Sequence, residues 1–141
     1  MALVASRLPG FQPTEEIFAT PAAFTGPGTA WLVGYDGDEA VCCGGLRPLD
    51  EDRVGEIKRM FVSGAARERG HGRALLAELE RRAWASGCRR VRLFTTEVLV
   101  EARALYESAG YRVVATVPDG ARTDLWLEKA LAEDCARDGD A

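Results

Sequence analysis

The chain has 141 residues, a formal net charge of −4 and a hydrophobic fraction of 47%. These values predict one globular domain, and they argue against general nucleic-acid binding, which usually requires a basic face. No apolar run approaches a membrane span, and the N-terminus lacks the basic and apolar regions of a signal peptide, so we expect a cytoplasmic protein that binds no membrane.

Residues 1–30 contain four prolines, which exclude long regular elements. Thr14 is a suitable N-cap and acidic residues follow it, so a short helix is predicted to begin there. From Ala30 onwards the pattern changes to alternating strands. The range 31–35 is predicted to pair with 39–46 across a turn at Asp36-Gly37, and 47–52 is predicted to be a loop.

The four cysteines, Cys42, Cys43, Cys88 and Cys135, form no C-x-x-C pair, and the chain has a single histidine. We therefore expect no metal site. Reduced thiols in a cytoplasmic protein are the expected state. Cys42 and Cys43 lie in a strand-like run, where cysteine behaves as a small hydrophobic residue.

The range 56–62 is predicted to be the central strand. Strict alternation would place Glu56, Lys58, Met60 and Val62 on one face and Ile57, Arg59 and Phe61 on the other. Charges on both faces are unusual for an interior strand. Either one end of the strand is exposed to solvent, or the charges line a polar cleft, which we favour because buried charge persists only when it is paired or used.

A short loop rich in arginine and glycine, Arg67 to Gly72, follows the central strand and leads into a helix predicted at 71–86, which Gly87 ends. The apolar stripe of this helix is Leu75, Leu76, Leu79 and Ala83, and its polar side is Glu78, Glu80, Arg81 and Arg82. A strand that leads through a glycine loop into a helix can bind an anion. The glycines allow a close approach of the backbone, and the first amides of the helix point outward.

The rest of the chain is predicted to hold a strand at 90–95, a helix at 100–108, and a hairpin of 111–117 and 124–131 with its turn at 118–120. The strand at 90–95 should lie parallel to the central strand, because a helix connects the two. We expect the domain to occupy 1–131 and the acidic tail, 132–141, to be disordered.

Three motifs resemble the GNAT acyltransferase superfamily and occur in the family's order. Arg67-x-x-Gly70-x-Gly72 resembles its R/Q-x-x-G-x-G/A signature, the strand at 56–62 resembles its central fourth strand, and 104–111 is similar to its A-L-Y-x-x-x-G-F/Y signature. The resemblance covers roughly 31–131. It implies an α+β fold with three layers, α/β/α, around a mixed, mostly antiparallel sheet whose central parallel strands splay apart.

The N-terminal region departs from the family's pattern. Family members usually have a strand and two helices before their second strand, and thirty residues with four prolines do not hold all three. We expect the first strand or the first helix to be shortened or missing. That change would alter the acceptor side of the site, and it would leave a sheet edge open at which a homodimer could form.

The resemblance implies transfer of an acetyl group from acetyl-CoA, without a metal, to an amine of a small molecule or peptide by direct attack. An antibiotic, a polyamine, an amino acid and a protein lysine all stay open as acceptors. The alternative is a catalytically silent module that binds acyl-CoA and acts in regulation or as a scaffold.

The resemblance also implies which residues form the site. The loop amides and nearby arginines would bind the pyrophosphate, and backbone amides at the end of the central strand would bind pantetheine and the thioester carbonyl. The expected cofactor-binding residues are Met60, Phe61, Val62, Arg67, Glu68, Arg69, Gly70, His71, Gly72, Arg73 and Tyr106.

Two residues are candidates for catalysis. Tyr106 occupies the position of a family tyrosine that protonates the leaving thiolate, although a half-buried packing role is the alternative. Glu56 lies eleven residues before Arg67 and matches an acid that some members use to deprotonate the amine. The equally weighted alternative for Glu56 is an ion-paired carboxylate at the strand start. Arg47, Lys58 and Arg59 are candidates for binding the acceptor.

Overall fold

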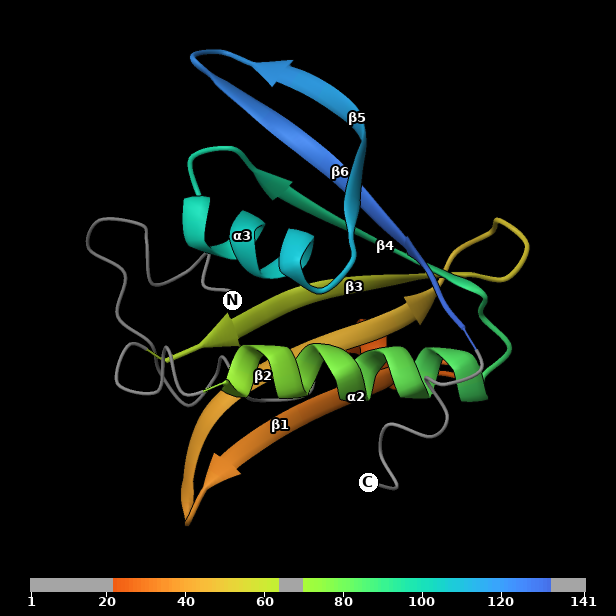
Figure 1. Cartoon of the computed structure of the whole chain (residues 1–141). Helices are drawn as coiled ribbons and strands as arrows, with labels where there is room; N and C mark the ends of the chain where they lie inside the picture. Colours follow the sequence, from red (N-terminus) through yellow and green to blue (C-terminus); the bar gives the residue numbers. More distant parts are fainter. Residues whose placement is uncertain (1–21, 64–69, 133–141) are drawn as a thin grey trace.

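The computed structural model describes residues 22–63 and 70–132 (Figure 1). Its elements in chain order are a 3-10 turn η2 (Ala22–Phe24), β1 (Ala30–Asp36), β2 (Glu39–Pro48), β3 (Val54–Val62), α2 (His71–Ala85), β4 (Arg90–Thr96), α3 (Val100–Ser108), β5 (Arg112–Asp119) and β6 (Arg122–Ala130). Each strand and helix predicted from 30 onwards is present. The predicted helix at Thr14, the shortened N-terminal region, most of the tail and Cys135 lie outside the described residues.

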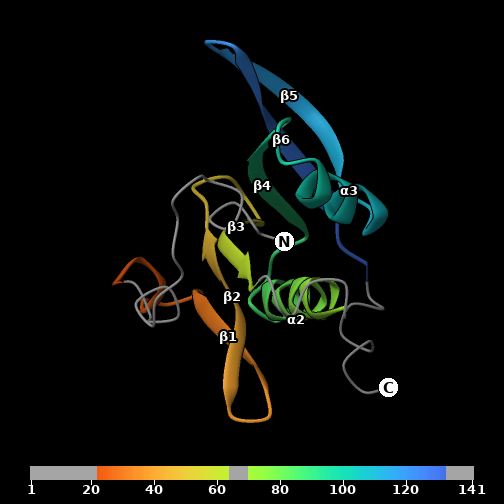
Figure 2. The ribbon, with the colours of Figure 1, turned by 90° about the vertical axis from the view of Figure 1, so that its left-hand side faces the viewer.

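The strands form one sheet in the order β1-β2-β3-β4-β6-β5. β3 and β4 are parallel, and the other neighbouring pairs are antiparallel, as the predicted mixed sheet requires. Figure 2 shows α2 and α3 on the same face of this sheet. α2 packs mainly on β2 and β1, and α3 packs on β4. The other face, which we call the helix-free face within the described residues, therefore presents strand side chains.

β2 and β5 extend past their predicted C-terminal ends, and each has a proline at or near its end. β2 includes Arg47 and Pro48, and β5 continues through Pro118 to Asp119. A proline is tolerated in these places because Pro48 is the last residue of its strand and β5 is an edge strand of the sheet. The predicted loop at 47–52 and the predicted turn at 118–120 are therefore shorter than expected.

The core lies between the sheet and the two helices. Leu75, Leu76, Leu79 and Ala83 of α2 are buried there, which confirms the predicted apolar stripe. Glu80 was predicted on the polar side, and this prediction is wrong, because the residue is only 5% exposed. Its burial is explained by two polar partners that reach it from the C-terminal part of the chain.

β3 does not alternate strictly. Arg59 has a positive φ of 56°, and the pairing of β2 with β3 shifts its register opposite this point, so β3 contains a bulge. As a result, Ile57 joins the same core as Met60 and Val62, and the prediction of opposite faces is wrong for these residues. The bulge also leaves Lys58 and Arg59 both exposed.

Gly45 of β2 is required by the packing on the helix-free face. A Cβ atom at this position would lie 2.6 Å from the ring of Phe24, which is itself 4% exposed. We predict that Gly45→Ala lowers the free energy of unfolding by ~1–3 kcal/mol, because the ring must move or the strand must shift. Gly26→Ala is the control, since no atom of the described residues lies within 4 Å of a Cβ at that position. Urea unfolding of both variants measures the effect, and equal stability would contradict the packing argument.

Candidate functional site

The two parallel strands at the centre of the sheet separate. β3 pairs with β4 only from Val54 opposite Arg90 to Ile57 opposite Leu93, although β3 continues to Val62. Figure 1 shows the strands diverging toward their C-terminal ends. Beyond Ile57, the edge of β3 that faces β4 has no partner strand among the described residues. An edge of this kind presents backbone donors and acceptors that a ligand can bind.

The N-terminus of α2 lies after this open edge in the chain. Gly70 is the N-cap in the left-handed conformation, with φ of 81°, and no side chain in 22–63 or 70–132 caps the helix. Among the described residues, nothing lies within 4 Å of the position that a Cβ of Gly70 would take. The first amides of α2 have no partners within the helix, and no acidic residue lies in its first turn. These features suit an anion such as a pyrophosphate.

Two further residues of this first turn were predicted to bind the ligand. The Nε2 atom of His71 is buried, and it has no hydrogen-bond partner in the described parts of the chain. Arg73 donates a hydrogen bond of 2.5 Å from Nη2 to Oγ of Ser108, which joins the start of α2 to the end of α3. Arg67, Glu68 and Arg69 lie outside the described residues.

Tyr106 lies on α3 and is buried, at 5% exposure, in the same core cluster as Met60 and Val62. Its ring meets the ring of Tyr111 edge to face, with 6.1 Å between centroids. Burial raises the pKa of Tyr106 well above its ordinary value. The phenol therefore keeps its proton at neutral pH and can act as a proton donor.

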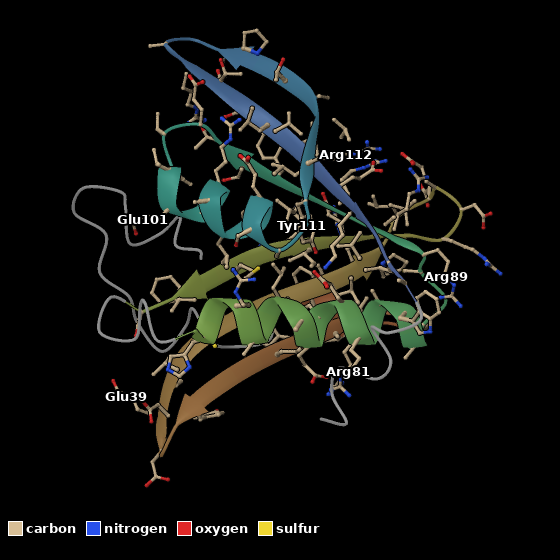
Figure 3. All side chains as sticks on the ribbon, viewed as in Figure 1. Glu39, Arg81, Arg89, Glu101, Tyr111 and Arg112 are labelled. Carbon is tan, nitrogen blue, oxygen red and sulfur yellow. The ribbon has the colours of Figure 1, made fainter. Side chains whose placement is uncertain are left out.

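Tyr111 is held at the junction of α3 and β5, where Figure 3 labels it. Its hydroxyl donates to Oε2 of Glu80 at 2.9 Å, and Lys129 of β6 donates to Oε1 of the same carboxylate, also at 2.9 Å. The backbone amide of Tyr111 donates to the carbonyl of Tyr106 at 3.0 Å. Glu80 was missed by sequence reasoning, because helical periodicity alone gave no sign that partners from 111 and 129 would reach it.

Glu56 and Arg47 form an ion pair on the helix-free face. Nε and Nη2 of Arg47 both lie 2.9 Å from Oε1 of Glu56. Glu56 is 4% exposed, whereas the Arg47 side chain is 39% exposed. Of the two interpretations of Glu56 made from the sequence, the ion-paired carboxylate is present in this structure. The pairing does not exclude a role as a base.

This pair is part of a row of alternating charges that sequence reasoning missed. Successive strands place Arg47 opposite Glu56, Glu56 opposite Arg92, and Arg92 opposite Glu128. Arg92 binds Glu51 at 2.7 Å and Glu128 at 2.8 Å, and these carboxylates raise the pKa of Arg92. Hydrogen bonding to Arg92 in turn lowers the pKa of Glu51. The row is visible only after the register of four strands is known.

Most of the predicted residues that the structure describes fall into two groups. Met60, Val62, Gly70, His71, Arg73 and Tyr106 belong to the open edge of β3, the start of α2 and α3. Arg47 and Glu56 lie together on the helix-free face. Along the described parts of the chain, no group of three or more His, Cys, Asp or Glu could hold a metal ion. The described helices include none that is long and apolar enough to cross a membrane.

Comparison with known proteins gives a family match over most of the chain. The family model described as "Acetyltransferase (GNAT) family" matches residues 3–111. The probable N-acetyltransferase 14 of Xenopus tropicalis is 36% identical over 83 residues, which is 59% of this chain and 40% of that protein. This chain spans between 30% and 58% of the length of the curated relatives that it matches.

Two solved structures show how far the fold is shared. A GCN5-related N-acetyltransferase from Kribbella flavida superposes with a TM-score of 0.70 at 26% identity, covering 85% of this chain and 79% of that one. An acyl-CoA N-acyltransferase from Klebsiella pneumoniae, described as putative, superposes with a TM-score of 0.65 at 32% identity, covering 74% and 73%. The arrangement of β3, β4, α2 and α3 therefore belongs to a known architecture.

We predict that Tyr111→Phe lowers the free energy of unfolding by ~1–3 kcal/mol, because it removes a buried hydrogen bond from the carboxylate of Glu80. Tyr35→Phe is the matched control, since Tyr35 is 64% exposed and its change should be below ~0.5 kcal/mol. Chemical denaturation of both variants tests this. A loss no larger at Tyr111 than at Tyr35 would show that the buried contact contributes little.

Proposed function

The chain belongs to the acetyltransferase (GNAT) family, and we propose that it moves an acetyl group from acetyl-CoA to an amine of a small molecule or peptide. The observation that carries this proposal is the combination of an open β3 edge, an uncapped α2 N-terminus and a buried tyrosine on α3. The open edge of β3 would bind the acyl end of the donor, and the N-terminus of α2 would bind its phosphates. The buried tyrosine would give a proton to the leaving group.

The phosphates of acetyl-CoA would bind at the first turn of α2. Gly70 gives the backbone room to approach, and the amides of His71, Gly72 and Arg73 point toward the anion. We assign Arg67, Glu68 and Arg69 to the same phosphate-binding site on the basis of their sequence positions. The orphaned Nε2 of His71 fits this assignment, because a buried nitrogen of this kind needs a ligand or water as its partner.

The acyl end of acetyl-CoA would lie along the open edge of β3. Bound there, it supplies an activated thioester. Backbone amides near Met60, Phe61 and Val62 would orient it and stabilise negative charge that develops on its carbonyl oxygen. This role depends on the backbone, so the bulge at Arg59, which turns the strand, matters more than the identity of the side chains.

Two side chains would handle protons. Tyr106 donates its proton to the sulfur as the amine displaces it, and solvent returns a proton to the phenol afterwards. Glu56 accepts a proton from the incoming amine, which at a pKa near ~10 is mostly charged at neutral pH, and passes it to solvent. The extra proton that the nitrogen carries after its attack also leaves to solvent. Both contacts from Arg47 are made to Oε1 of Glu56, so we assign the proton transfer to Oε2, directly or through a water molecule.

The binding step is tested by Gly70→Glu. We predict that calorimetric titration with acetyl-CoA gives binding in wild type and at least tenfold weaker binding in the variant. The introduced carboxylate would occupy the N-terminus of α2 and repel the phosphates of acetyl-CoA. Gly120→Glu is the matched control, because Gly120 also has a positive φ, of 63°, and open space around it, but lies in the β5–β6 turn. Equal acetyl-CoA affinity in the two variants would show that the cofactor does not bind at the N-terminus of α2.

The chemical step is tested by Tyr106→Phe. We predict a fall in kcat of about 10²–10⁴-fold with unchanged acetyl-CoA binding, because the phenol proton is lost while the packing is retained. Free CoA release with a panel of amines measures turnover. An unchanged kcat would assign Tyr106 to packing. Tight acetyl-CoA binding without turnover on any amine would favour the regulatory or scaffold module.

A further inference from the structure

Lys58 projects from the same face as the Arg47–Glu56 pair. It lies opposite Gly45, and residues directly opposite each other in an antiparallel pair share a face. A Cβ on Gly45 would meet Phe24, and Arg47 follows two residues after Gly45. Phe24 therefore packs over Gly45 on this face. Lys58 is the cross-strand neighbour of Gly45, and the Arg47–Glu56 pair lies two residues further along the same two strands.

The charges at this position do not cancel. Arg47 already neutralises Glu56 at 2.9 Å, whereas Lys58 and Arg59 have no ion-pair partner within residues 22–63 and 70–132. Both side chains are exposed. Around Glu56 on this face, Arg47 and Arg92 are held in ion pairs with carboxylates, so Lys58 is the exposed cation that is left over among the described residues of this row, in a chain whose formal net charge is −4. A local positive field in an acidic protein attracts anions and repels polycations.

We propose that the acceptor is an amine that carries a second, anionic group, such as the carboxylate of an amino acid. This inference rests on the proposed function, since it places the amine at Glu56. Glu56 and Lys58 are two residues apart on one strand face, so their Cα atoms lie about 7 Å apart. A small acceptor can therefore give its amine to Glu56 and its anionic group to Lys58 and the exposed edge of Arg47.

The same arrangement disfavours amines that carry several positive charges. A polyamine or an aminoglycoside would bring further cations next to Lys58, where the neighbouring carboxylate, Glu56, is already paired with Arg47. Within a set of amines, the presence of an anionic group should therefore decide the substrate preference.

The experiment compares matched acceptors with the full-length protein and acetyl-CoA. Single compounds are compared: each of the twenty amino acids with its amide, phosphoethanolamine with ethanolamine, and polyamines as a separate set. We expect kcat/KM for the best amino acid or for phosphoethanolamine to exceed that for its neutral counterpart by at least about tenfold, the scale of one charge-assisted hydrogen bond. The better of the two identifies the anionic group as a carboxylate or a phosphate.

The side-chain assignment is tested by Lys58→Gln. We expect KM for the anionic acceptor to rise severalfold with kcat nearly unchanged, and KM for the amide to change little, while Lys58→Arg keeps the preference. Arg82→Gln removes an equal charge from the exposed side of α2 and serves as the control.

The outcomes separate this inference from the proposed function. Turnover of amines without any preference for an anionic group overturns the inference and leaves acetyl transfer standing. A preference that survives Lys58→Gln also overturns it, because the recognition would then lie elsewhere. Failure of every amine to accept the acetyl group, with acetyl-CoA bound, overturns both.

Discussion

Pairing between β3 and β4 stops after Ile57, and the arrangement of the site depends on that break. A fully paired parallel sheet would have no backbone groups to offer a ligand at its centre. The bulge at Arg59 turns the end of β3 while keeping Met60 and Val62 in the core. The strand therefore stays anchored on one face while its edge opens, and α2 begins close to where the strand ends.

The helix-free face combines apolar packing at Phe24 with a row of paired charges. Arg47, Glu56, Arg92 and Glu128 lie opposite one another across four strands, so that each cation is next to a carboxylate. Buried charge is tolerated there because it is paired. At Lys58 the pattern stops, and this cation is exposed on the same face with no ion-pair partner in the described parts of the chain. The paired charges of Arg47, Glu56, Arg92 and Glu128 stabilise the sheet, whereas the exposed charge of Lys58 is available to bind a ligand.

Local signals in the sequence were enough for much of the fold. α2 and α3 were predicted within one residue at each end, because Gly70, Gly87 and Gly110 mark their limits and leucines mark the buried face of α2. The break in the alternation of β3 and the burial of Glu80 were not predicted, since the first depends on a bulge and the second on partners from 111 and 129. The Arg47–Glu56 pair likewise required the register of two strands.

The contact between Lys129 and Glu80 joins residues 49 positions apart in the chain. A growing polypeptide that has emerged only as far as α3 would bury a carboxylate in α2 without its cation, and an uncompensated buried charge is strongly destabilising. We therefore expect the earlier elements to stay incompletely packed until β6 has emerged from the ribosome. Synthesis of the last strand then completes the folding of the whole domain in one cooperative step.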